Sequence, residues 1–446
     1  MPQQLTEAAG AAFVTDDSLM TSSRFKSRES IKQQQQMQLR ALLEALSDNR
    51  FYSARLRAAG VTPDVSLSEF ESRMPFTFKQ EIADDQRLHP PYGTNLNYPL
   101  ERYTRFCQTS GTSGSPIHWL DTPESWNWML NCWAQVFRAA AVGPHDRLFF
   151  AFSFAPFLGF WTAFEAAVKL GLLSIPGGGL SSAARLGMIR ENAITVLCCT
   201  PTYSLHLAEV AKEEGFDLSS LRVAKVIVAG EPGGSIPSVR SRIEALWNGA
   251  RVIDHHGMTE TGPVSYQCPV MADVLHILES DFIAEVIDPQ SGQGVAHGQT
   301  GELVLTNLGR SGSPILRYRT SDLVKRAEST ACVCGSHEMA LQGGILGRTD
   351  DMVTVRGVNL YPAAVEEIVR SCQGVGEYRV VFEKRRELAE VALEVEPSAD
   401  CQDCSTLGER LRKMLGMAFP LRIPVSVLPV GSLPRFEMKA KRWVWR

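Results

Sequence analysis

The chain has 446 residues, more than one compact core usually holds, so we expect two or more domains. Hydrophobic residues make up 44% and charged residues 21% of the sequence, which is typical of an ordinary soluble globular protein. The formal net charge of −4 provides no basic surface for nucleic acid or for an acidic membrane. We therefore predict neither a nucleic-acid partner nor a membrane partner.

The first 23 residues are polar and acidic, which predicts neither a signal peptide nor a transit peptide. We accordingly expect a cytoplasmic protein whose ten cysteines are reduced thiols or metal ligands rather than disulfides. The apolar stretch 148–175 could be mistaken for a membrane span. It contains Pro156, Glu165 and Lys169, so a buried strand, a loop and a helix are the better interpretation.

The N-terminal part is predicted to be helical. A helix is expected over residues 31–46 and a short one over residues 66–73. The apolar face of the first helix comprises Met37, Leu39, Leu42, Leu43 and Leu46.

From residue 148, strand and helix patterns alternate. Apolar strands are expected at 148–154, 194–199, 223–229 and 251–255, and amphipathic helices at 161–170, 203–213 and around 239–247. This alternation predicts a mostly parallel sheet covered on both faces. Such sheets bind ligands at the carboxyl ends of their strands, and polar, glycine-containing loops follow the third and fourth strands, at Gly230–Gly234 and His256–Pro263.

Beyond residue 281 the pattern changes to antiparallel strands, at 282–287, 302–306 and 323–325. A smaller unit follows, with a helix that begins at Tyr361-Pro362, strands at 378–382 and 389–395, and a helix at 406–415. The sequence thus predicts an α/β fold in two domains. Residues 1–348 form a large N-terminal domain, with mostly parallel sheets flanked by helices and a small antiparallel β portion. Residues 349–446 form a small, mobile C-terminal α+β domain.

Hydroxyl and glycine residues alternate in Thr109-Ser110-Gly111-Thr112-Ser113-Gly114, followed by Ser115 and Pro116. Glycine lets consecutive N–H groups converge on an anion, and short hydroxyl side chains can add hydrogen bonds to phosphate. Taken alone, the stretch is better interpreted as a linker or a surface turn than as a phosphate site. No lysine follows its last glycine, so it does not match the G-x-x-x-x-G-K-[ST] phosphate loop.

Further motifs follow the glycine-rich stretch in a fixed order. They are Gly230–Pro232, His256–Glu260, Arg317–Asp322, Gly347–Asp351 and Lys439. In this order the set resembles the adenylate-forming superfamily of acyl-CoA synthetases, peptide-synthetase adenylation domains and luciferases. Within it the chain resembles the phenylacetate-CoA ligase branch, from about residue 35 to the C-terminus. The branch is indicated by Phe51-Tyr52, Gly60–Pro63, Met74–Lys79, Leu197–Tyr203, Arg356–Pro362 and Lys439–Arg442.

The resemblance implies a role for each motif. Residues Thr109–Gly114 would hold the β- and γ-phosphates of ATP, Thr259 would contact phosphate, and Glu260 would bind Mg²⁺. Asp322 would accept hydrogen bonds from ribose, with Arg348 nearby. The adenine site would be formed by Gly230, Glu231, Pro232, His255, His256, Gly257 and Met258.

The catalytic cation implied by the resemblance is Lys439, which would bridge the substrate carboxylate and the phosphate. The tail also holds Lys441, so this choice rests on the family pattern. The alternative for Glu260, Asp322 or Lys439 taken singly is a solvated surface charge. The chain departs from the family where Ser115 replaces a usual lysine, His256 a usual tyrosine and Met438 a usual glycine.

The resemblance also implies a moving C-terminal domain. Asp350 would be its hinge, and Arg356, Gly357 and Val358 would face the thiol of coenzyme A. An ordinary acidic turn is the alternative for Asp350. Phe152, Phe154 and Phe157 lie where the family forms its acyl pocket and would suit an aryl acid, although most aromatic residues there could simply be core.

A metal site is predicted at Cys268, His276, Cys332 and Cys334. Three sulfurs and an imidazole suit tetrahedral Zn²⁺, and four protein ligands imply a structural site. Several members of the branch have similar ligands. Unrelated buried thiols, with His337 as a substitute ligand, are the alternative.

Together these features predict an ATP-dependent, AMP-forming ligase that adenylates an aromatic or heteroaromatic acid and transfers the acyl group to coenzyme A. A carrier-protein thiol or an amine remains open as the acceptor, and a homodimer remains open as the assembly. A non-catalytic nucleotide-binding protein with this fold is the rival from another class. Retention of Glu260, Asp322, Arg348 and Lys439 argues against it.

Overall fold

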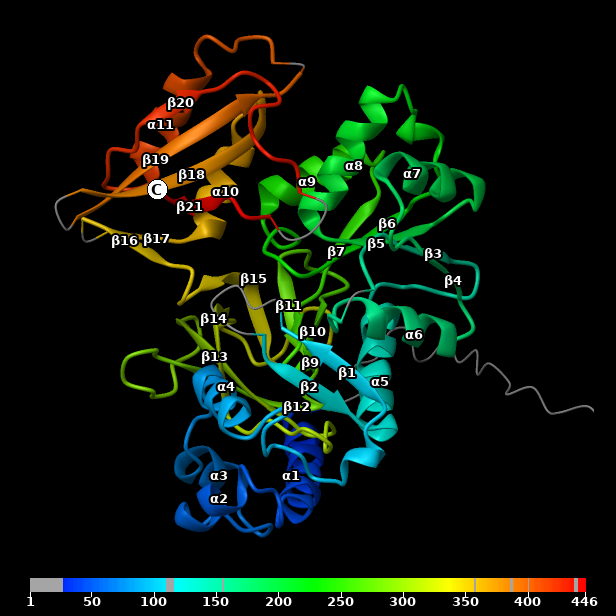
Figure 1. The fold of residues 1–446 in the computed structure, drawn as a ribbon, viewed down its shortest axis with the longest axis vertical. Coiled ribbons are helices and arrows are strands. Elements are labelled where there is room, and N and C mark those ends of the chain that lie inside the picture. Colours follow the sequence, from blue (N-terminus) through cyan, green and yellow to red (C-terminus); the bar gives the residue numbers. More distant parts are fainter. Residues whose placement is uncertain are drawn as a thin grey trace, which may run out of the picture.

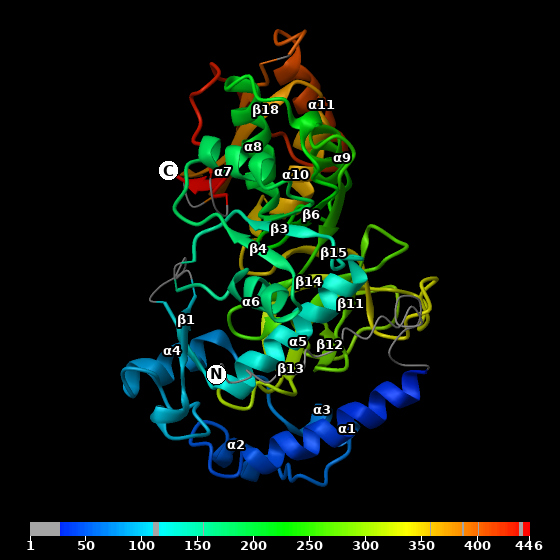
Figure 2. The same ribbon diagram turned by 90° about the vertical axis from the view of Figure 1, so that its right-hand side faces the viewer.

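The computed structural model describes residues 27–109, 116–154, 156–356, 358–385, 388–399, 401–436 and 440–446. The predicted site residues Ser110–Gly114, Gly357 and Lys439 lie outside these ranges. Helices of the N-terminal part form one end of the molecule, sheets form its middle, and the C-terminal strands lie at the opposite end (Figure 1). Figure 2 shows the same order from the side.

Four helices form the N-terminal end: α1 (Arg28–Ala45), α2 (Ser53–Ala58), α3 (Leu67–Arg73) and α4 (Lys79–Leu88). Ser27 caps α1, and Ser66 with Glu69 forms a capping box at α3. The leucines expected on the inner face of α1 are buried, together with apolar residues of the central sheet such as Ile283 and Leu316. Met37 was wrongly placed on that face, since 65% of it is exposed.

A hairpin of β1 (Arg105–Gln108) and β2 (His118–Asp121) precedes the long helix α5 (Pro123–Ala139). The parallel sheet follows in the order β4-β3-β5-β6-β7. Its strands are β3 (Arg147–Phe150), β4 (Leu173–Pro176), β5 (Val196–Cys199), β6 (Lys225–Val228) and β7 (Arg251–Asp254). Its further helices are α6 (Trp161–Lys169), α7 (Ser182–Glu191), α8 (Pro201–Glu213) and α9 (Pro237–Leu246).

Alternate residues of each parallel strand enter different cores, because successive side chains point to opposite faces. Phe150 and Cys198 pack with α5 and α6, whereas Phe149 and Leu197 pack with α7, α8 and α9. The prediction of a parallel sheet covered on both faces is confirmed. The strand expected at 148–154 ends at Phe150, and α5, β4 and α7 were not foreseen.

A six-stranded antiparallel sheet has the order β10-β11-β15-β14-β13-β12. Its strands are β10 (Ser265–Gln267), β11 (Val274–Ile277), β12 (Phe282–Ile287), β13 (Thr300–Asn307), β14 (Tyr318–Arg326) and β15 (Ala340–Arg348). A small hairpin of β8 (Gly257–Met258) and β9 (Gly262–Pro263) precedes it. The Thr77 N–H donates to the Arg317 carbonyl, and the Arg319 N–H donates to the Thr77 carbonyl, next to the start of β14. The N-terminal helices are therefore joined directly to this sheet.

The C-terminal unit, residues 353–445, has its own core. A hairpin of β16 (Val353–Val355) and β17 (Val358–Leu360) leads to α10 (Pro362–Ser371). A four-stranded sheet in the order β20-β19-β18-β21 follows. It contains β18 (Val375–Arg385), β19 (Leu388–Pro397), β20 (Val425–Val427) and β21 (Trp443–Trp445), and α11 (Leu407–Ala418) packs in the same core. In Figure 1 this unit stands beside α8 and α9.

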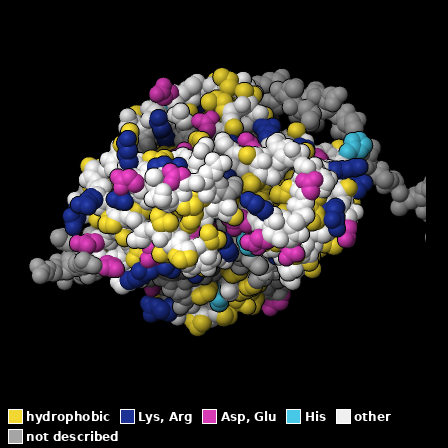
Figure 3. All heavy atoms as spheres, turned by 90° about the horizontal axis from the view of Figure 1, so that it is seen from above, with side chains coloured by type: hydrophobic (Ala, Val, Ile, Leu, Met, Phe, Trp, Pro, Cys, Tyr) yellow, Lys and Arg dark blue, Asp and Glu magenta, His cyan; other side chains and the backbone are white. Residues whose placement is uncertain are grey.

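Among the helices of the described ranges, none has the length and apolar character needed to cross a membrane. Figure 3 views the molecule from the side of the C-terminal unit. On the part of that face formed by described residues, Lys and Arg side chains are interspersed with Asp and Glu side chains. This mixture agrees with the small net charge of the chain.

Candidate active site

The predicted nucleotide residues gather at the carboxyl ends of the parallel strands. Gly230, Glu231 and Pro232 directly follow β6, and His255 and His256 directly follow β7. Gly230 has φ +94°, a backbone conformation that glycine adopts without strain. The two loops therefore leave neighbouring strands at one edge of the sheet, where ligands of parallel sheets bind.

Asp322 and Arg348 are cross-strand partners in β14 and β15. The Arg348 Nη1 donates to Asp322 Oδ1 at 2.9 Å, and His256 Nε2 lies 2.9 Å from Asp322 Oδ2. The structure thus brings three predicted nucleotide residues together, with His256 and Arg348 on either oxygen of the buried Asp322 carboxylate. The His256 Nδ1 atom is buried and has no hydrogen-bond partner among the described residues, so it can still accept or donate one bond to a ligand.

His255 points away from this cluster into the core. Its ring packs against Trp133, with ring centroids 4.2 Å apart, and its Nδ1 donates to the Ser265 carbonyl at 2.7 Å. Burial lowers the pKa of His255 to about 3, so the imidazole is neutral at physiological pH. Its place is that of a core residue behind the site.

Glu260 is buried beside two polar side chains. Its Oε1 lies 3.1 Å from Lys79 Nζ at the start of α4, and the Tyr318 hydroxyl donates to the same oxygen at 3.4 Å. Burial raises the pKa of Tyr318, and the negative charge of Glu260 raises it further, so the phenol remains a proton donor. A buried carboxylate with one cationic neighbour is a suitable ligand for Mg²⁺.

Arg310 fixes the backbone next to Glu260. Its Nη1 donates to the Thr259 carbonyl at 2.6 Å and to the Glu260 carbonyl at 3.1 Å. The same guanidinium binds Asp121 at the end of β2 through two bonds of 2.7 and 2.6 Å, and both side chains are fully buried. Arg310 therefore ties the hairpin that carries the glycine-rich residues to the loop that carries Thr259 and Glu260.

Sequence reasoning missed Lys79, Asp121 and Arg310. Lys79 ends a stretch that helped to indicate the family branch, but no role was assigned to it. Asp121 and Arg310 are 189 positions apart, and neither lies in a recognisable motif. Only the fold brings them together.

Thr109 is the described member of the predicted phosphate loop. Its backbone N–H donates to the Ile117 carbonyl at 3.0 Å, and its hydroxyl oxygen accepts from the Ile117 N–H at 3.0 Å. Thr109 is buried and closes the hairpin of β1 and β2 at its base. The glycine-rich residues 110–115 connect these two strands.

The predicted acyl-pocket residues belong to an aromatic cluster that follows β3. The rings of Phe152 and Phe154 are 4.6 Å apart, and Phe152 also packs against Phe160 at 5.2 Å. Phe160 contacts Trp133 at 5.8 Å, and Trp133 contacts His255. A continuous series of ring contacts thus links the cluster to the loop after β7. Phe157 is half-buried on the connection between β3 and α6.

The predicted hinge residue Asp350 is exposed, and its carboxylate accepts two bonds of 2.8 Å from the Arg348 guanidinium. Arg348 thus contacts both Asp322 and the hinge position. Arg356, in the turn between β16 and β17, has φ +51° and donates to Glu390 of β19 at 3.2 Å. Val358 is half-buried in β17.

The four predicted zinc ligands converge, and their ligand atoms all lie within 4.8 Å of one another. Cys268 Sγ lies 3.7 Å from Cys332 Sγ, and Cys334 Sγ lies 3.4 Å from His276 Nε2. A tetrahedral ion with Zn–S distances of about 2.3 Å has sulfurs about 3.8 Å apart, so the donor set fits Zn²⁺. The cluster joins the β10–β11 connection to the 332–336 turn between β14 and β15.

Comparison with known proteins places this site in a family. The AMP-binding enzyme family matches residues 23–309, and the C-terminal domain of AMP-binding enzymes matches residues 357–445. This chain belongs to the AMP-binding enzyme family. The phenylacetate-coenzyme A ligase of Pseudomonas putida is 31% identical to it over 436 residues, which cover 95% of this chain and 96% of that protein. The ligase of the same name from Escherichia coli K12 is 30% identical over 416 residues, covering 90% and 91%.

Solved structures of another AMP-binding enzyme, 2-hydroxyisobutyryl-CoA ligase, share the fold. In its postadenylation state with an acyl adenylate, that enzyme is 26% identical and has a TM-score of 0.90, with 99% of this chain and 95% of that chain covered. In its thioesterification state it is 27% identical with the same coverage, and the TM-score is 0.73. The structure as a whole therefore matches the postadenylation state better than the thioesterification state.

These comparisons confirm the sequence prediction of an adenylate-forming enzyme in the phenylacetate-CoA ligase branch. They also confirm the predicted fold and the predicted class of AMP-forming acid–CoA ligase. ATP, a carboxylic acid and coenzyme A are the substrates of that class. The roles of individual residues remain predictions.

Proposed function

We propose that this enzyme adenylates an aryl or heteroaryl carboxylic acid and transfers the acyl group to coenzyme A. In the first step a carboxylate oxygen bonds to the α-phosphorus of ATP, and the bond to pyrophosphate breaks. In the second step the thiolate of coenzyme A bonds to the acyl carbon, and AMP leaves with the former carboxylate oxygen. Both steps gather negative charge on phosphate, so they depend on positioning and on cationic groups.

The residues around Asp322 would hold the nucleoside. Asp322 is buried between His256 and Arg348, and its carboxylate oxygens are of the acceptor type that ribose hydroxyls need. The unpartnered Nδ1 of His256 is available to the base or the ribose. Glu260 would hold Mg²⁺, which when bound neutralises charge on the phosphates. Lys439 is proposed as the cation between the carboxylate and the α-phosphate.

The aromatic cluster is the observation that carries the aryl-acid proposal. Phe152, Phe154 and Phe160 stand at the carboxyl end of β3 and are linked through Trp133 to the loop after β7. An aromatic substrate can stack against such rings with a gain of roughly 0.5–1.5 kcal/mol beyond simple burial.

A panel of acids tests the substrate class. Pyrophosphate release is measured with phenylacetate, benzoate, a heteroaryl acid, 2-hydroxyisobutyrate and a medium-chain fatty acid, each with and without coenzyme A. We expect kcat/KM to be at least tenfold higher for an aryl acid. A preference for the hydroxy acid or the fatty acid would overturn the aryl assignment. Release of AMP without consumption of coenzyme A would instead indicate a carrier-protein thiol or an amine as acceptor.

We also propose that Cys268, His276, Cys332 and Cys334 bind structural Zn²⁺. The support is the donor set and its spacing, with no fifth group among the described residues placed as a ligand. The ion would hold the antiparallel sheet together at a distance from the nucleotide residues. Elemental analysis of purified enzyme is expected to give one zinc per chain, and Cys334→Ser is expected to lower both the zinc content and the melting temperature. A zinc-free native enzyme of full stability would reject the site.

Residues 349–446 are proposed to act as a mobile lid that turns about Asp350, with Arg356, Gly357 and Val358 facing the thiol in the second step. The separate match of the C-terminal family domain and the two states of 2-hydroxyisobutyryl-CoA ligase support this proposal. A cytoplasmic location is proposed because none of the ten cysteines, all of which lie in the described ranges, forms a disulfide in the structure. A homodimer stays a prediction, which light scattering coupled to size-exclusion chromatography tests.

A further inference from the structure

We propose that the side chain of Glu231 is a positioning residue, which together with Thr202 receives the C-terminal tail and sets the adenylation geometry. This inference rests on the proposed function and extends it. Sequence reasoning placed Glu231 with the adenine-lining backbone. The structure gives its carboxylate a different task.

Both oxygens of Glu231 accept backbone hydrogen bonds from different parts of the molecule. Oε1 accepts from the Thr202 N–H in the first turn of α8, at 2.8 Å. Oε2 accepts from the Ala440 N–H in the C-terminal tail, also at 2.8 Å. Ala440 directly follows Lys439 in the chain. The carboxylate therefore bridges the start of a rigid helix and the residue next to the proposed catalytic cation.

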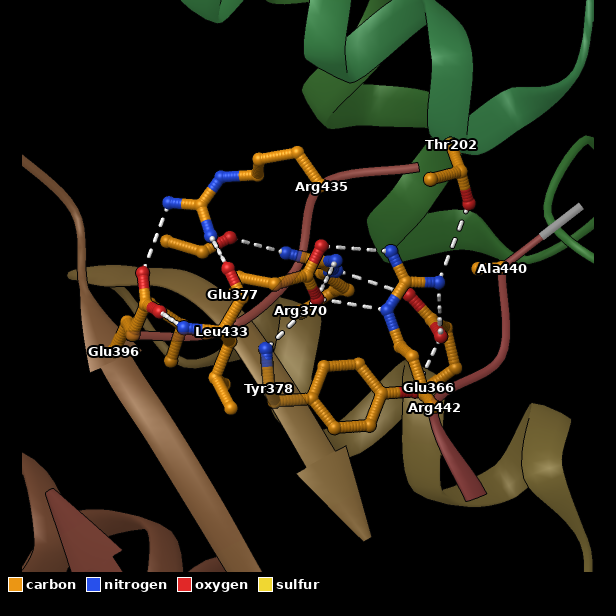
Figure 4. A network of polar contacts seen from close by, with 12 residues as sticks. Thr202, Glu366, Arg370, Glu377, Tyr378, Glu396, Leu433, Arg435, Ala440 and Arg442 are labelled. Carbon is orange, nitrogen blue, oxygen red and sulfur yellow. Dashed lines mark hydrogen bonds and ion pairs between the residues drawn. The ribbon is translucent and has the colours of Figure 1, made fainter. Parts of the chain in front are cut away.

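A second contact reinforces the first. Arg442, two residues beyond Ala440, donates from Nη1 to the Thr202 hydroxyl at 3.2 Å. Figure 4 shows Thr202 reaching down from α8 toward Arg442, with Ala440 on the adjoining stretch of tail. The tail is thus held by a backbone bond to Glu231 and by a side-chain bond to Thr202 in the first turn of α8.

Arg442 is itself fixed inside the C-terminal unit. It is buried and makes a two-bond pair with Glu377, at 2.7 and 3.0 Å, and an ion pair with Glu366 at 3.6 Å. Arg370 contacts the same two carboxylates, and the ring of Tyr378 lies against the Arg442 guanidinium (Figure 4). The ring of Phe436 lies against the same guanidinium. Because Arg442 cannot move independently of this network, its contact with Thr202 can form only when the whole C-terminal unit lies next to α8.

These contacts belong to one arrangement of the C-terminal unit. The chain matches the postadenylation state of 2-hydroxyisobutyryl-CoA ligase with a TM-score of 0.90 and the thioesterification state with 0.73. The lid motion proposed above would carry Ala440 and Arg442 away from α8 between these states. Glu231 and Thr202 then stabilise the tail during adenylation and have no such contact during thioester formation.

Loss of the Glu231 carboxylate should therefore affect the two half-reactions unequally. In Glu231→Gln the amide oxygen can accept one of the two N–H groups, but the amide nitrogen faces the other as a second donor. A hydrogen bond to a charged group is worth roughly a 10- to 100-fold change in rate when it is made only in the reacting arrangement. Removing a negative charge near ATP would by itself favour nucleotide binding. A purely electrostatic effect of Glu231→Gln would therefore improve adenylation, whereas loss of positioning would impair it.

The test measures both half-reactions. Adenylation is followed as acid-dependent ATP–pyrophosphate exchange at saturating ATP, and thioester formation as the reaction of synthetic acyl adenylate with coenzyme A. For Glu231→Gln we expect kcat for exchange to fall 10- to 100-fold while KM for ATP changes less than about threefold. The thioester rate should fall less, so that the ratio of the two rates drops at least tenfold.

Three further variants decide between positioning and other roles. Glu231→Asp keeps the charge but cannot span both N–H groups, so it should behave like Glu231→Gln. Thr202→Val removes only the hydroxyl and should shift the same ratio in the same direction, by about 3- to 10-fold. Glu244→Gln is the matched control, because its Oε1 accepts the Val252 N–H at 3.1 Å within the large domain. The control should leave the ratio at its wild-type value.

An unchanged ratio in Glu231→Gln overturns the inference, as does a defect confined to KM for ATP, which would indicate a purely adenine-binding role. If Glu231→Gln does not fold, the ratio measured for Thr202→Val decides the question alone. Absence of acid-dependent exchange in the wild-type enzyme would instead be a failure of the proposed function.

Discussion

The buried charges around Glu377 make the stability of the C-terminal unit dependent on acid pH. Burial alone would raise the pKa of Glu377, but the positive charges of Arg370 and Arg442 and their hydrogen bonds outweigh it and hold the pKa at about 2, against an ordinary value of 4.5. The difference of about 2.5 pKa units corresponds to about 3 kcal/mol. Because the folded-state pKa is lowered, this stabilisation is complete above pH 4.5 and is lost as the pH falls toward 2.

Guanidinium unfolding at pH 6, 4, 3 and 2 measures this effect. We expect Glu377→Gln to be less stable than wild type at pH 6 and to lose about 3 kcal/mol less between pH 6 and pH 2. Glu409→Gln, which removes an exposed carboxylate of the same unit, gives the background for comparison. The same pH slope in wild type and Glu377→Gln would refute the reasoning.

Three other variants test the site. Lys79→Met removes the cation beside Glu260, so in EDTA the free energy of unfolding should fall by about 1 kcal/mol, and added Mg-ATP should stabilise the variant more than wild type in thermal melts. Asp322→Asn should raise KM for ATP about 10- to 100-fold in pyrophosphate exchange, and an unchanged KM would remove Asp322 from the ribose site. Arg310→Met should cost about 3–5 kcal/mol in chemical unfolding by leaving Asp121 buried and unpaired, and a loss below 1 kcal/mol would contradict that account.

Much of the fold could be read from periodicity. The parallel strands carry short apolar runs between amphipathic helices, and β12 was predicted over its observed residues 282–287. The helix α5 was missed although Thr122 caps it and Pro123 occupies its first turn. Its aromatic residues pack on both the parallel and the antiparallel sheet, so no single polar face marks it as a helix. β14 is longer than predicted because its first half holds charged residues that form ion pairs, such as Arg319 with the buried Glu302.

Parts of the site could be predicted where the residue types have few possible roles. The four proposed zinc ligands are an example, because cysteine and histidine at metal spacing have few alternatives, and the four predicted ligand atoms do converge. His255 illustrates the opposite case. It stands next to His256 in the sequence, yet one imidazole reaches Asp322 while the other packs against Trp133 in the core.

Contacts between residues far apart in the sequence could not be predicted from the sequence. The contact between Asp121 and Arg310, and that between Glu231 and Ala440, join residues 189 and 209 positions apart. A charged residue outside a motif gives no sign of its partner until the chain is folded, because its most frequent state is solvated. These pairs therefore required the structure.

The backbone pairing of Thr77 with the start of β14 has a practical consequence for the design of truncated versions of this enzyme. The Thr77 N–H and carbonyl pair with Arg317 and Arg319, and the Thr77 hydroxyl donates to the Leu316 carbonyl at 2.7 Å. Tyr318 and Asp322 lie on the same strand, so the segment around Thr77 supports the strand that bears the proposed ribose-binding residue Asp322. A shortened version that starts at β1 would expose Leu316 and free that edge for aggregation. Fusion partners and tags are better attached ahead of α1 than in place of it.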